Sequence, residues 1–243
     1  MPLSDRGTLD GRTALVTGAS RGIGLAVARA LVGAGARTYC LARSRDALAR
    51  ETSALGSLAE PLVCDLTRGD DVARSLEGLA AVPGGGPDIV VQNAGLFTLA
   101  SVLETTPDVF AGTLAANLVG PYRLLHALVA AMLRRASGHV VTIGSIADRV
   151  AFAENVAYAA SKFGARAVHE VLRAELRGSG VRVSLVSPGP VDTTLWDAVD
   201  PDSRPHLTPR ARMLRPEHVA AAVLFAVTCD AALNVDELRL TRA

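Results

Sequence analysis

Thr17-Gly-Ala-Ser-Arg-Gly-Ile-Gly24 joins the strand-like run Arg12–Thr17 to the helix-like run Leu25–Val32. Glycines in such a turn let the backbone bend sharply and approach a pyrophosphate, whose charge then meets free amides and the positive end of the helix dipole. The spacing Gly-x-x-x-Gly-x-Gly differs from the general dinucleotide fingerprint Gly-x-Gly-x-x-Gly. Two interpretations therefore stay open for the turn alone, a nucleotide site or a turn that only packs a helix on a strand.

Short runs rich in Val, Leu and Ile alternate with longer Ala/Leu/Arg segments of helical period along the rest of the chain. That alternation is typical of repeated βαβ units and predicts an α/β fold, a doubly wound (Rossmann) and mostly parallel seven-stranded sheet with helices on both faces. The predicted strands are Arg12–Thr17, Arg37–Ala42, Glu60–Cys64, Asp88–Val91, His139–Gly144, Val181–Val186 and Asp236–Leu240.

The length of 243 residues and a hydrophobic content of 49% suit one sizeable core, so we expect a single domain over residues 1–243. Residues 192–215 are proline-rich and show little periodicity, which favours a functional loop over the substrate site. The formal net charge of +1 and evenly spread arginines argue against nucleic-acid binding, and we find no apolar run that suggests a membrane span. Because Met1–Arg6 lacks the apolar core of a secretory signal, a cytoplasmic protein is expected.

Cysteine and histidine give no sign of a metal site. The three cysteines are widely separated and have no histidine nearby, so we expect ordinary buried thiols at Cys40, Cys64 and Cys229. The five histidines show no ligand spacing, and solvent-facing or helix-end positions are expected for His126, His139, His169, His206 and His218.

The second predicted strand ends at Ala42, where a dinucleotide fold places the group that contacts the adenosine ribose. An acidic residue there would favour NAD, but Leu41, Ala42 and Arg43 include no carboxylate. Arg43 and Arg21 together could hold a 2′-phosphate by charge-assisted hydrogen bonds. NADP(H) is therefore favoured over NAD(H), the alternative being two solvated arginines in an arginine-rich protein.

Lys162 is the only lysine among 25 cationic side chains, and it stands four residues after Tyr158. A position that keeps lysine in such a chain needs a compact ammonium that arginine cannot replace. Tyr158 and Lys162 lie one turn apart on one helix face, and Ser145 follows a predicted strand, so all three can converge on one carbonyl. A phenol ionises in water only near about pH 10, so a tyrosine acid or base at neutral pH needs such a neighbouring cation.

With these pieces the chain resembles the short-chain dehydrogenase/reductase family over nearly its whole length. The matching motifs are Thr17-Gly-Ala-Ser-Arg-Gly-Ile-Gly24, Asp65-Leu66, Asn93-Ala-Gly95, Asn117, Ser145, Tyr158-x-x-x-Lys162 and Pro188-Gly-Pro-Val-Asp-Thr193. Taken singly, Asn93 could cap a turn, Asn117 could bond a helix backbone and Ser145 could end a strand. Together they indicate a catalytic set of Asn117, Ser145, Tyr158 and Lys162.

The resemblance implies hydride transfer between nicotinamide C4 and a carbonyl or secondary alcohol carbon, with Tyr158 as general acid/base and no metal. It places Asp65 at the adenine, Thr193 at the carboxamide, and a water held by Asn117 between Lys162 and solvent. It also implies a homo-oligomer, a tetramer or dimer, packed through the helices that carry Asn117 and Tyr158. The expected cofactor residues are Gly18, Ser20, Arg21, Gly22, Ile23, Gly24, Arg43, Asp65, Leu66, Asn93, Ala94, Gly95, Tyr158, Lys162, Pro188, Gly189, Val191 and Thr193.

The substrate is expected to be a small carbonyl or alcohol compound, apolar in part, because bulky Leu96 and Phe97 follow Gly95. Further candidate wall residues, each of which could instead be core, are Val150, Phe152, Val191, Leu195, Trp196, Met213 and Leu214. The last ten residues, Asn234–Ala243, lack the glycine pair common in 3-oxoacyl-carrier-protein reductases, which weakens an assignment to that activity. Two hypotheses from different functional classes also stay open, an NADP-sensing regulator and a scaffold on the same fold.

Overall fold

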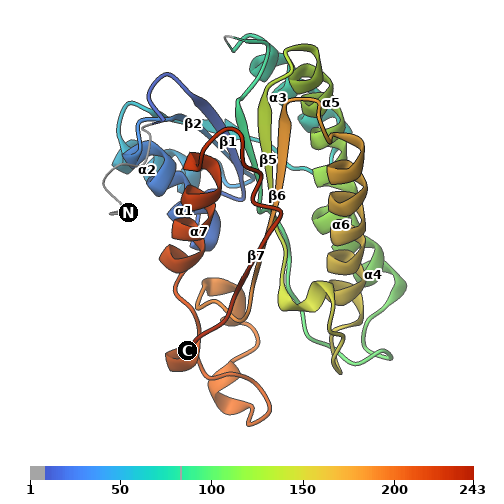
Figure 1. Cartoon of the computed structure of the whole chain (residues 1–243). Helices are drawn as coiled ribbons and strands as arrows, with labels where there is room; N and C mark the ends of the chain where they lie inside the picture. The colour runs from blue at the N-terminus through green and yellow to red at the C-terminus, as the bar shows by residue number, and fades with distance from the viewer. Residues whose placement is uncertain (1–8, 83) are drawn as a thin grey trace.

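The computed structural model describes residues 9–82 and 84–243 of the chain, so Met1–Arg6, on which the expectation about a secretory signal depended, lie outside the described residues. One seven-stranded sheet forms the centre, in the order β3-β2-β1-β4-β5-β6-β7, and all its neighbouring strands are parallel (Figure 1). The predicted fold class is confirmed, and each predicted strand lies within two residues of the observed one. The strands are β1 (Thr13–Thr17), β2 (Arg37–Ala42), β3 (Ala59–Val63), β4 (Ile89–Gln92), β5 (Gly138–Ile143), β6 (Val181–Pro188) and β7 (Glu237–Leu240).

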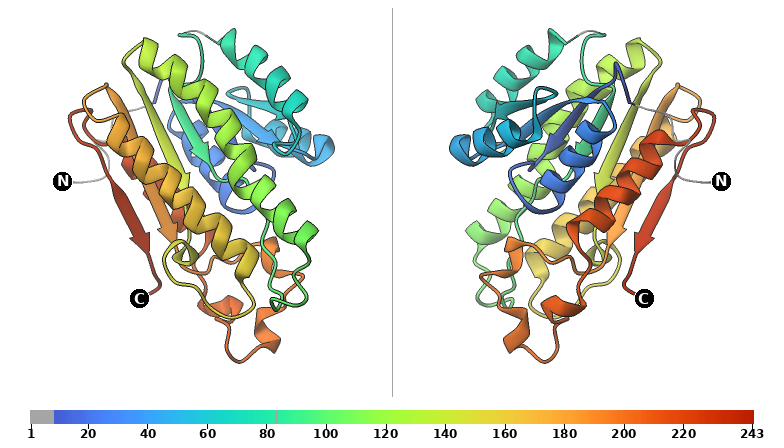
Figure 2. Two further views of the ribbon diagram at one scale, coloured as in Figure 1. Left: turned by 90° about the vertical axis from the view of Figure 1, so that its right-hand side faces the viewer. Right: turned by 90° about the vertical axis from the view of Figure 1, so that its left-hand side faces the viewer.

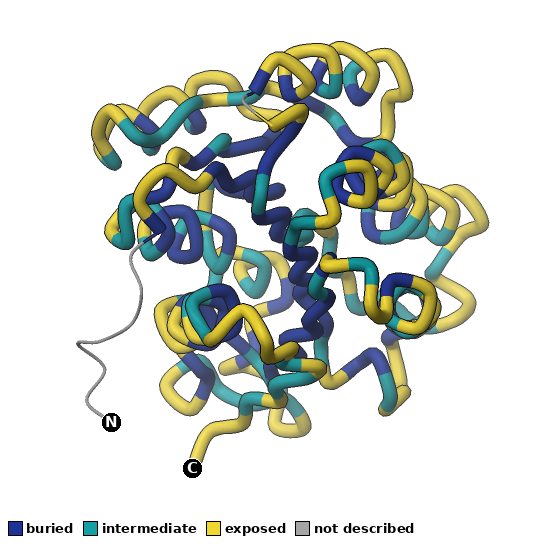
Figure 3. Tube along the Cα trace, turned by 45° about the horizontal axis from the view of Figure 1, so that its top comes forward, coloured by how far each residue is buried: buried dark blue, intermediate teal, exposed yellow. Residues whose placement is uncertain are grey.

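Helices cover both faces of this sheet (Figures 1 and 2). One face carries α1 (Gly22–Gly33), α2 (Arg45–Leu55) and α7 (Pro216–Thr228), and the other carries α3 (Gly69–Ala80), α5 (Gly120–Arg134) and α6 (Val156–Glu175), with α4 (Pro107–Leu114) against α6. Successive residues of β1 serve opposite cores because strand side chains alternate, Val16 packing with α1 and α7, and Leu15 with α5. The strands are accordingly the most deeply buried part of the chain (Figure 3).

The order of the strands reverses between β1 and β4, which are neighbours although β2 and β3 separate them in sequence. In sheets of this kind, ligands bind in the crevice beyond the carboxyl ends of the strands at such a reversal. The glycine-rich turn at residues 17–24 follows β1 and therefore lies at that crevice. The expected substrate loop, residues 192–215, lies at the same end of the sheet (orange in Figure 1) and folds into three short 3-10 turns, Thr194–Trp196, Pro201–Ser203 and Arg210–Arg212.

One helical run, Pro107–Arg134, is long and apolar enough to cross a membrane by length and composition, which the sequence interpretation did not foresee. Its apolar residues have another explanation, because Leu124, Leu128 and Met132 are 4% exposed or less and pack into the core beneath the sheet. A helix that serves a protein core meets the same two criteria, so this run is weak evidence for a membrane span.

The expectation of exposed or helix-end histidines is wrong for two of them, since His139 and His169 are each only 2% exposed. His139 lies in β5, where its Nε2 and Ser184 Oγ are 2.8 Å apart, and burial lowers the pKa of His139 to about 3. Cys40 and Cys64 are buried free thiols as expected, whereas Cys229 is only half-buried. In residues 9–82 and 84–243, no group of His, Cys, Asp and Glu side chains is arranged to hold a metal ion.

Candidate active site

The turn between β1 and α1 is built for close approach of the backbone. Gly18 and Gly22 have φ of +69° and +55°, which L side chains rarely adopt. A Cβ on Gly18 would lie 2.9 Å from Ala94 Cα, and one on Gly24 would lie 2.5 Å from Asn93 Nδ2. No side chain caps the first turn of α1 at Arg21, so its amides stay free for an anion. The three glycines thus leave room that any larger residue would fill.

Asn93 and Thr17 fix this turn to the end of β4. The Asn93 amide Nδ2 donates to Thr17 O at 3.0 Å, and Thr17 Oγ1 accepts from the backbone amides of Asn93 at 2.9 Å and Ala94 at 3.0 Å. The interpretation of Asn93 as a residue that bonds a turn is therefore correct, and it is compatible with the predicted place beside the cofactor. Thr17 itself was not singled out from the sequence, because its role depends on a strand more than 70 residues away.

A cleft of about 750 Å³ opens over the turn. Of the predicted cofactor residues, it is lined by Gly18, Ser20, Arg21, Gly22, Ile23, Arg43, Asp65, Leu66, Asn93, Ala94, Gly95 and Thr193. Six predicted residues do not line it: Gly24, Tyr158, Lys162, Pro188, Gly189 and Val191. Sequence reasoning missed other lining residues, among them Leu41, Ser44, Ala47, Arg50, Cys64, Thr67 and Leu195. Most of these flank predicted positions, so neighbourhood in sequence was the signal that could have found them.

The far end of the cleft carries unsatisfied positive charge. Within the described residues, neither Arg21 nor Arg43 makes a hydrogen bond or ion pair, and both guanidinium groups are on exposed residues at the cleft. Asp65 lies beside them. Burial opposes its ionisation, but hydrogen bonds from the Thr67 hydroxyl at 2.7 Å and amide at 2.9 Å, with nearby Arg43, lower the pKa of Asp65. The end therefore offers two free cations and one stable carboxylate.

Lys162 and Tyr158 lie on one face of α6, as predicted. Lys162 is 9% exposed, and its Nζ donates to Ile143 O at the end of β5 over 2.9 Å. The same Nζ lies 5.6 Å from the centroid of the Tyr158 ring. The Tyr158 hydroxyl makes no hydrogen bond to a described residue, so it is free for a ligand. A buried ammonium thus stands beside an available phenol.

Asn117 occupies a π-helical turn, Ala115–Val119, that joins α4 to α5. Its Oδ1 accepts from Leu96 N at 2.7 Å, while its Nδ2 donates to Leu96 O at 2.9 Å and to Ser161 Oγ at 3.0 Å. The side chain therefore holds the loop after β4 against α6. Single π turns are frequent at functional sites. A small cavity of about 30 Å³, enough to hold a water, is lined by both Asn117 and Lys162.

Ser145 begins a 3-10 turn, Ile146–Asp148, directly after β5. Its Oγ accepts from Ala147 N at 3.1 Å, which leaves the hydroxyl hydrogen free to be donated elsewhere. The turn packs against α6, the helix that carries Tyr158 and Lys162. The four predicted catalytic residues are thus brought to the carboxyl end of the sheet by β5, α6 and the π turn.

An aromatic wall of Phe97, Tyr158 and Trp196 borders the site. The Phe97 ring meets Tyr158 edge to face at a centroid distance of 4.9 Å and meets Trp196 at 4.8 Å. Trp196 is fixed by a hydrogen bond from its Nε1 to Val191 O at 3.0 Å. Three of the remaining candidate wall residues are instead core, since Val191, Met213 and Leu214 are 7% exposed or less, whereas Val150 and Phe152 remain exposed.

Comparison with known proteins agrees with this architecture. The short chain dehydrogenase family model matches residues 12–204. The chain is 38% identical to D-threitol dehydrogenase of Mycolicibacterium smegmatis (93% of this chain, 89% of that protein) and 31% identical to a 3-oxoacyl-acyl-carrier-protein reductase of Salmonella typhimurium (95% of each). A solved gluconate 5-dehydrogenase from Burkholderia cenocepacia in complex with NADP and tartrate has 29% identity and a TM-score of 0.85, over 98% of this chain and 96% of that one. With the sheet order, the glycine-rich turn and the tyrosine–lysine pair in place, these matches establish that the chain belongs to the short-chain dehydrogenase/reductase family of oxidoreductases.

Proposed function

We propose that this oxidoreductase prefers NADP(H) and transfers a hydride between nicotinamide C4 and a carbonyl or secondary alcohol carbon, with Tyr158 as general acid/base. The observation that carries the proposal is the buried Lys162 ammonium beside the Tyr158 ring, whose hydroxyl has no other described partner. A nearby cation favours the phenolate over the phenol, so Tyr158 can give its proton to a substrate oxygen and recover it at neutral pH.

The residues of the cleft fit a dinucleotide phosphate. Gly18, Gly22 and Gly24 form a cradle that a Cβ would fill, and the start of α1 offers free amides to a pyrophosphate. Arg21 and Arg43 have no described hydrogen-bond or ion-pair partner of their own, which suits them to bind a 2′-phosphate. Bound NADPH would supply the hydride. The similar gluconate 5-dehydrogenase was crystallised with NADP, which supports the same preference here.

Three further groups complete the proposed chemistry. Ser145 donates its free hydroxyl hydrogen to the substrate oxygen and so stabilises charge that develops there. Lys162 keeps N–H groups beyond the one given to Ile143 O, and these can meet the nicotinamide ribose and a water. The cavity shared by Lys162 and Asn117 has room for that water, which would return protons from solvent to the site.

The aromatic wall indicates the substrate class. Phe97 and Trp196 present ring surfaces beside Tyr158. The two lid cations are already paired, because Arg204 binds Glu154 at 3.0 Å and Arg210 binds Asp192 at 2.8 Å. A ketone or alcohol with an apolar or aromatic substituent therefore suits this wall better than an anionic sugar acid does. The similarity to D-threitol dehydrogenase makes small polyols the competing substrate class.

We also propose a homo-oligomer formed through α5 and α6. Several large apolar side chains on these helices are exposed: Val119, which precedes α5, and Tyr122, Leu133, Phe163 and Val171. Exposed apolar groups of this size on two neighbouring helices favour burial against another copy. Size-exclusion chromatography with light scattering distinguishes a dimer or tetramer from a monomer, and a monomer at micromolar concentration would contradict this part of the proposal.

The decisive experiment is the initial rate of NADPH and NADH consumption across aromatic ketones, aldehydes, 3-oxoacyl thioesters and sugar-derived ketones, with Tyr158→Phe as the control. We expect NADPH-preferring turnover of apolar ketones that the substitution abolishes. The reverse reaction with D-threitol and NADP tests the polyol class. Tight NADPH binding without turnover on any substrate would favour a sensor of NADP, and failure of NADPH to raise the melting temperature would favour a scaffold.

A further inference from the structure

A fully buried carboxylate lies three residues after Ser145. Asp148 is 1% exposed as a residue, and none of its side chain reaches solvent. Charged side chains are almost never buried to this extent unless they are paired, because removal from water costs several kcal/mol. Neither the general acid/base chemistry of Tyr158 nor the cofactor cleft uses this residue. Its position therefore requires a separate explanation.

The two oxygens of Asp148 have different partners. Oδ2 faces the catalytic turn, where it accepts from Ser187 Oγ at 2.6 Å and from the Ser145 backbone amide at 3.3 Å. Oδ1 faces two cations, accepting from Arg149 Nε at 2.9 Å with Arg166 Nη1 at 3.8 Å. The carboxylate thus binds the first residue of the turn on one side and is neutralised on the other.

The backbone beside it is shaped for this contact. A Cβ added to Gly144 would lie 2.5 Å from Asp148 Oδ2 and 2.6 Å from Ser187 Oγ. Distances below 3.0 Å are not tolerated, so only glycine at position 144 lets the carboxylate reach Ser145 N. Ser145 is then fixed at two atoms, its amide by Asp148 and its Oγ by Ala147 N. Only its hydroxyl hydrogen is left without a partner.

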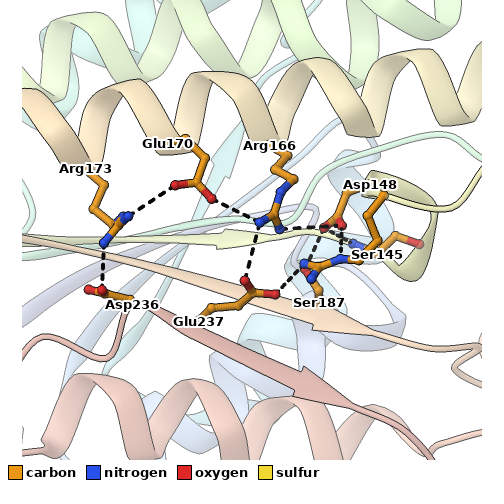
Figure 4. Close-up of polar contacts among 9 residues, drawn as sticks. Ser145, Asp148, Arg166, Glu170, Arg173, Ser187, Asp236 and Glu237 are labelled. Atoms are coloured by element: carbon orange, nitrogen blue, oxygen red, sulfur yellow. Dashed lines mark hydrogen bonds and ion pairs between the residues drawn. The ribbon is translucent and has the colours of Figure 1, made fainter.

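The arginines are in turn held by a chain of charges that crosses from α6 to β7 (Figure 4). Arg149 and Arg166 both pair with Glu237 of β7, Arg166 at 3.5 Å. The chain continues from Arg166 to Glu170 at 3.1 Å, to Arg173 at 3.4 Å and to Asp236 at 2.7 Å. The carboxylate is therefore anchored to two elements that do not belong to the catalytic turn.

We propose that Asp148 is a positioning residue that holds the Ser145 turn in the geometry for donation to the substrate oxygen. The proposal rests on the proposed function for the role of Ser145, but the contact itself does not. A carboxylate that only joined β7 to α6 would need the arginines and Glu237, and it would have no reason to bind Ser145 N and Ser187 Oγ.

The test is a double-mutant cycle. Asp148→Asn keeps the side-chain size but removes the charge that holds the turn. We expect it to lower kcat at least about tenfold in the Ser145 enzyme, with KM little changed, and to lower it less than about twofold further in Ser145→Ala. Glu237→Gln is the matched control, because it weakens the same arginine pairs without contact to the turn. It should lower the melting temperature and leave kcat within about twofold. Equal losses of kcat from Asp148→Asn in both backgrounds would overturn the proposal.

A second measurement does not depend on turnover. Hydrogen–deuterium exchange of the peptide that includes Ser145 should be faster in Asp148→Asn and unchanged in Glu237→Gln, because only the first loses the bond to Ser145 N. If Asp148→Asn fails to fold, Ser187→Ala removes the shortest bond to Oδ2 and should show the same pattern more weakly. Unchanged exchange in the folded variant refutes the proposal even if no substrate is found, whereas loss of all turnover in the wild type refutes only the proposed function.

Discussion

Replacing Gly24 with alanine tests whether the turn at residues 17–24 is a cofactor cradle. The residue lies in the first turn of α1, where alanine is otherwise a better helix former than glycine. Its added Cβ would lie 2.5 Å from Asn93 Nδ2 and 2.7 Å from the carbonyl carbon of Gly18, with the Gly18 oxygen closer still. Two of these three atoms belong to the backbone of the turn. The turn itself must therefore move to accept the methyl group.

The cost follows from the overlap. Ordinary contact begins at 3.4 Å, so the nearest of these quoted contacts, at 2.5 Å, is about 0.9 Å too short. Overpacking of this kind costs about 1–3 kcal/mol. If the displaced turn loses that much of its interaction with the pyrophosphate, NADPH binds about 5- to 150-fold more weakly. At 100 times the wild-type Kd, NADPH stabilises the protein by about 2.7 kcal/mol, and a 50-fold weaker Kd leaves about 0.65 kcal/mol.

The assay is the NADPH-dependent rise in melting temperature, with the Kd from fluorescence titration as a second readout. Gly33→Ala in the same helix is the control, since nothing lies within 4 Å of its added Cβ. We expect Gly33→Ala to keep the full NADPH effect and to stabilise the free protein by up to about 1 kcal/mol. A full NADPH shift in Gly24→Ala, or an equal loss in both variants, would refute the assignment of this turn to the cofactor.

Three further predictions concern single charged or titratable groups. Lys162→Arg should keep the melting temperature within a few degrees but lower kcat by about 100-fold or more, because the larger planar guanidinium cannot replace an ammonium bound to Ile143 O; near-wild-type kcat would contradict this. Arg43→Ala should raise the Kd of NADPH about tenfold or more while leaving that of NADH unchanged, as titrations of both cofactors would show. The folded-state pKa of His139 is about 3, below the unfolded value of 6.5, so the unfolded state binds more protons between these values. Stability should therefore fall as the pH drops from about 6.5 toward 3, with a slope approaching about 1.4 kcal/mol per pH unit, and His139→Gln should flatten the decline measured by urea unfolding.

Local sequence signals were enough for the sheet. Each strand is a short apolar run that ends at a turn signal, and β1, β2 and β6 begin within a residue of their predicted starts because Gly, Arg and polar residues flank them. Parallel pairing followed from the helices between the strands, since a crossover helix returns the chain to the same end of the sheet. The position of the cleft could then be predicted from topology alone.

Features that depend on pairs distant in sequence could not be predicted. The π turn at Asn117 gives no periodic signal, and its bonds reach Leu96 and Ser161, which lie 21 and 44 residues away. Burial of His139 results from its place inside β5 next to Ser184 of β6, which ligand spacings along the sequence do not reveal. Asp148 looks like an ordinary turn residue, and only the pairing of Arg149 with Glu237, 88 residues later, shows that it is enclosed.

The two buried charges beside the site are satisfied to different degrees, and this difference separates their roles. Lys162 has one described hydrogen bond, to Ile143 O, although an ammonium carries three donors. A buried cation with unused donors is costly unless something else binds there, which is what a catalytic group requires. Asp148 has its oxygens occupied by two serine residues and two arginines, so it has nothing to offer a ligand. The unsatisfied charge is therefore expected to act on the substrate and cofactor, and the satisfied one to hold the turn from which Ser145 acts.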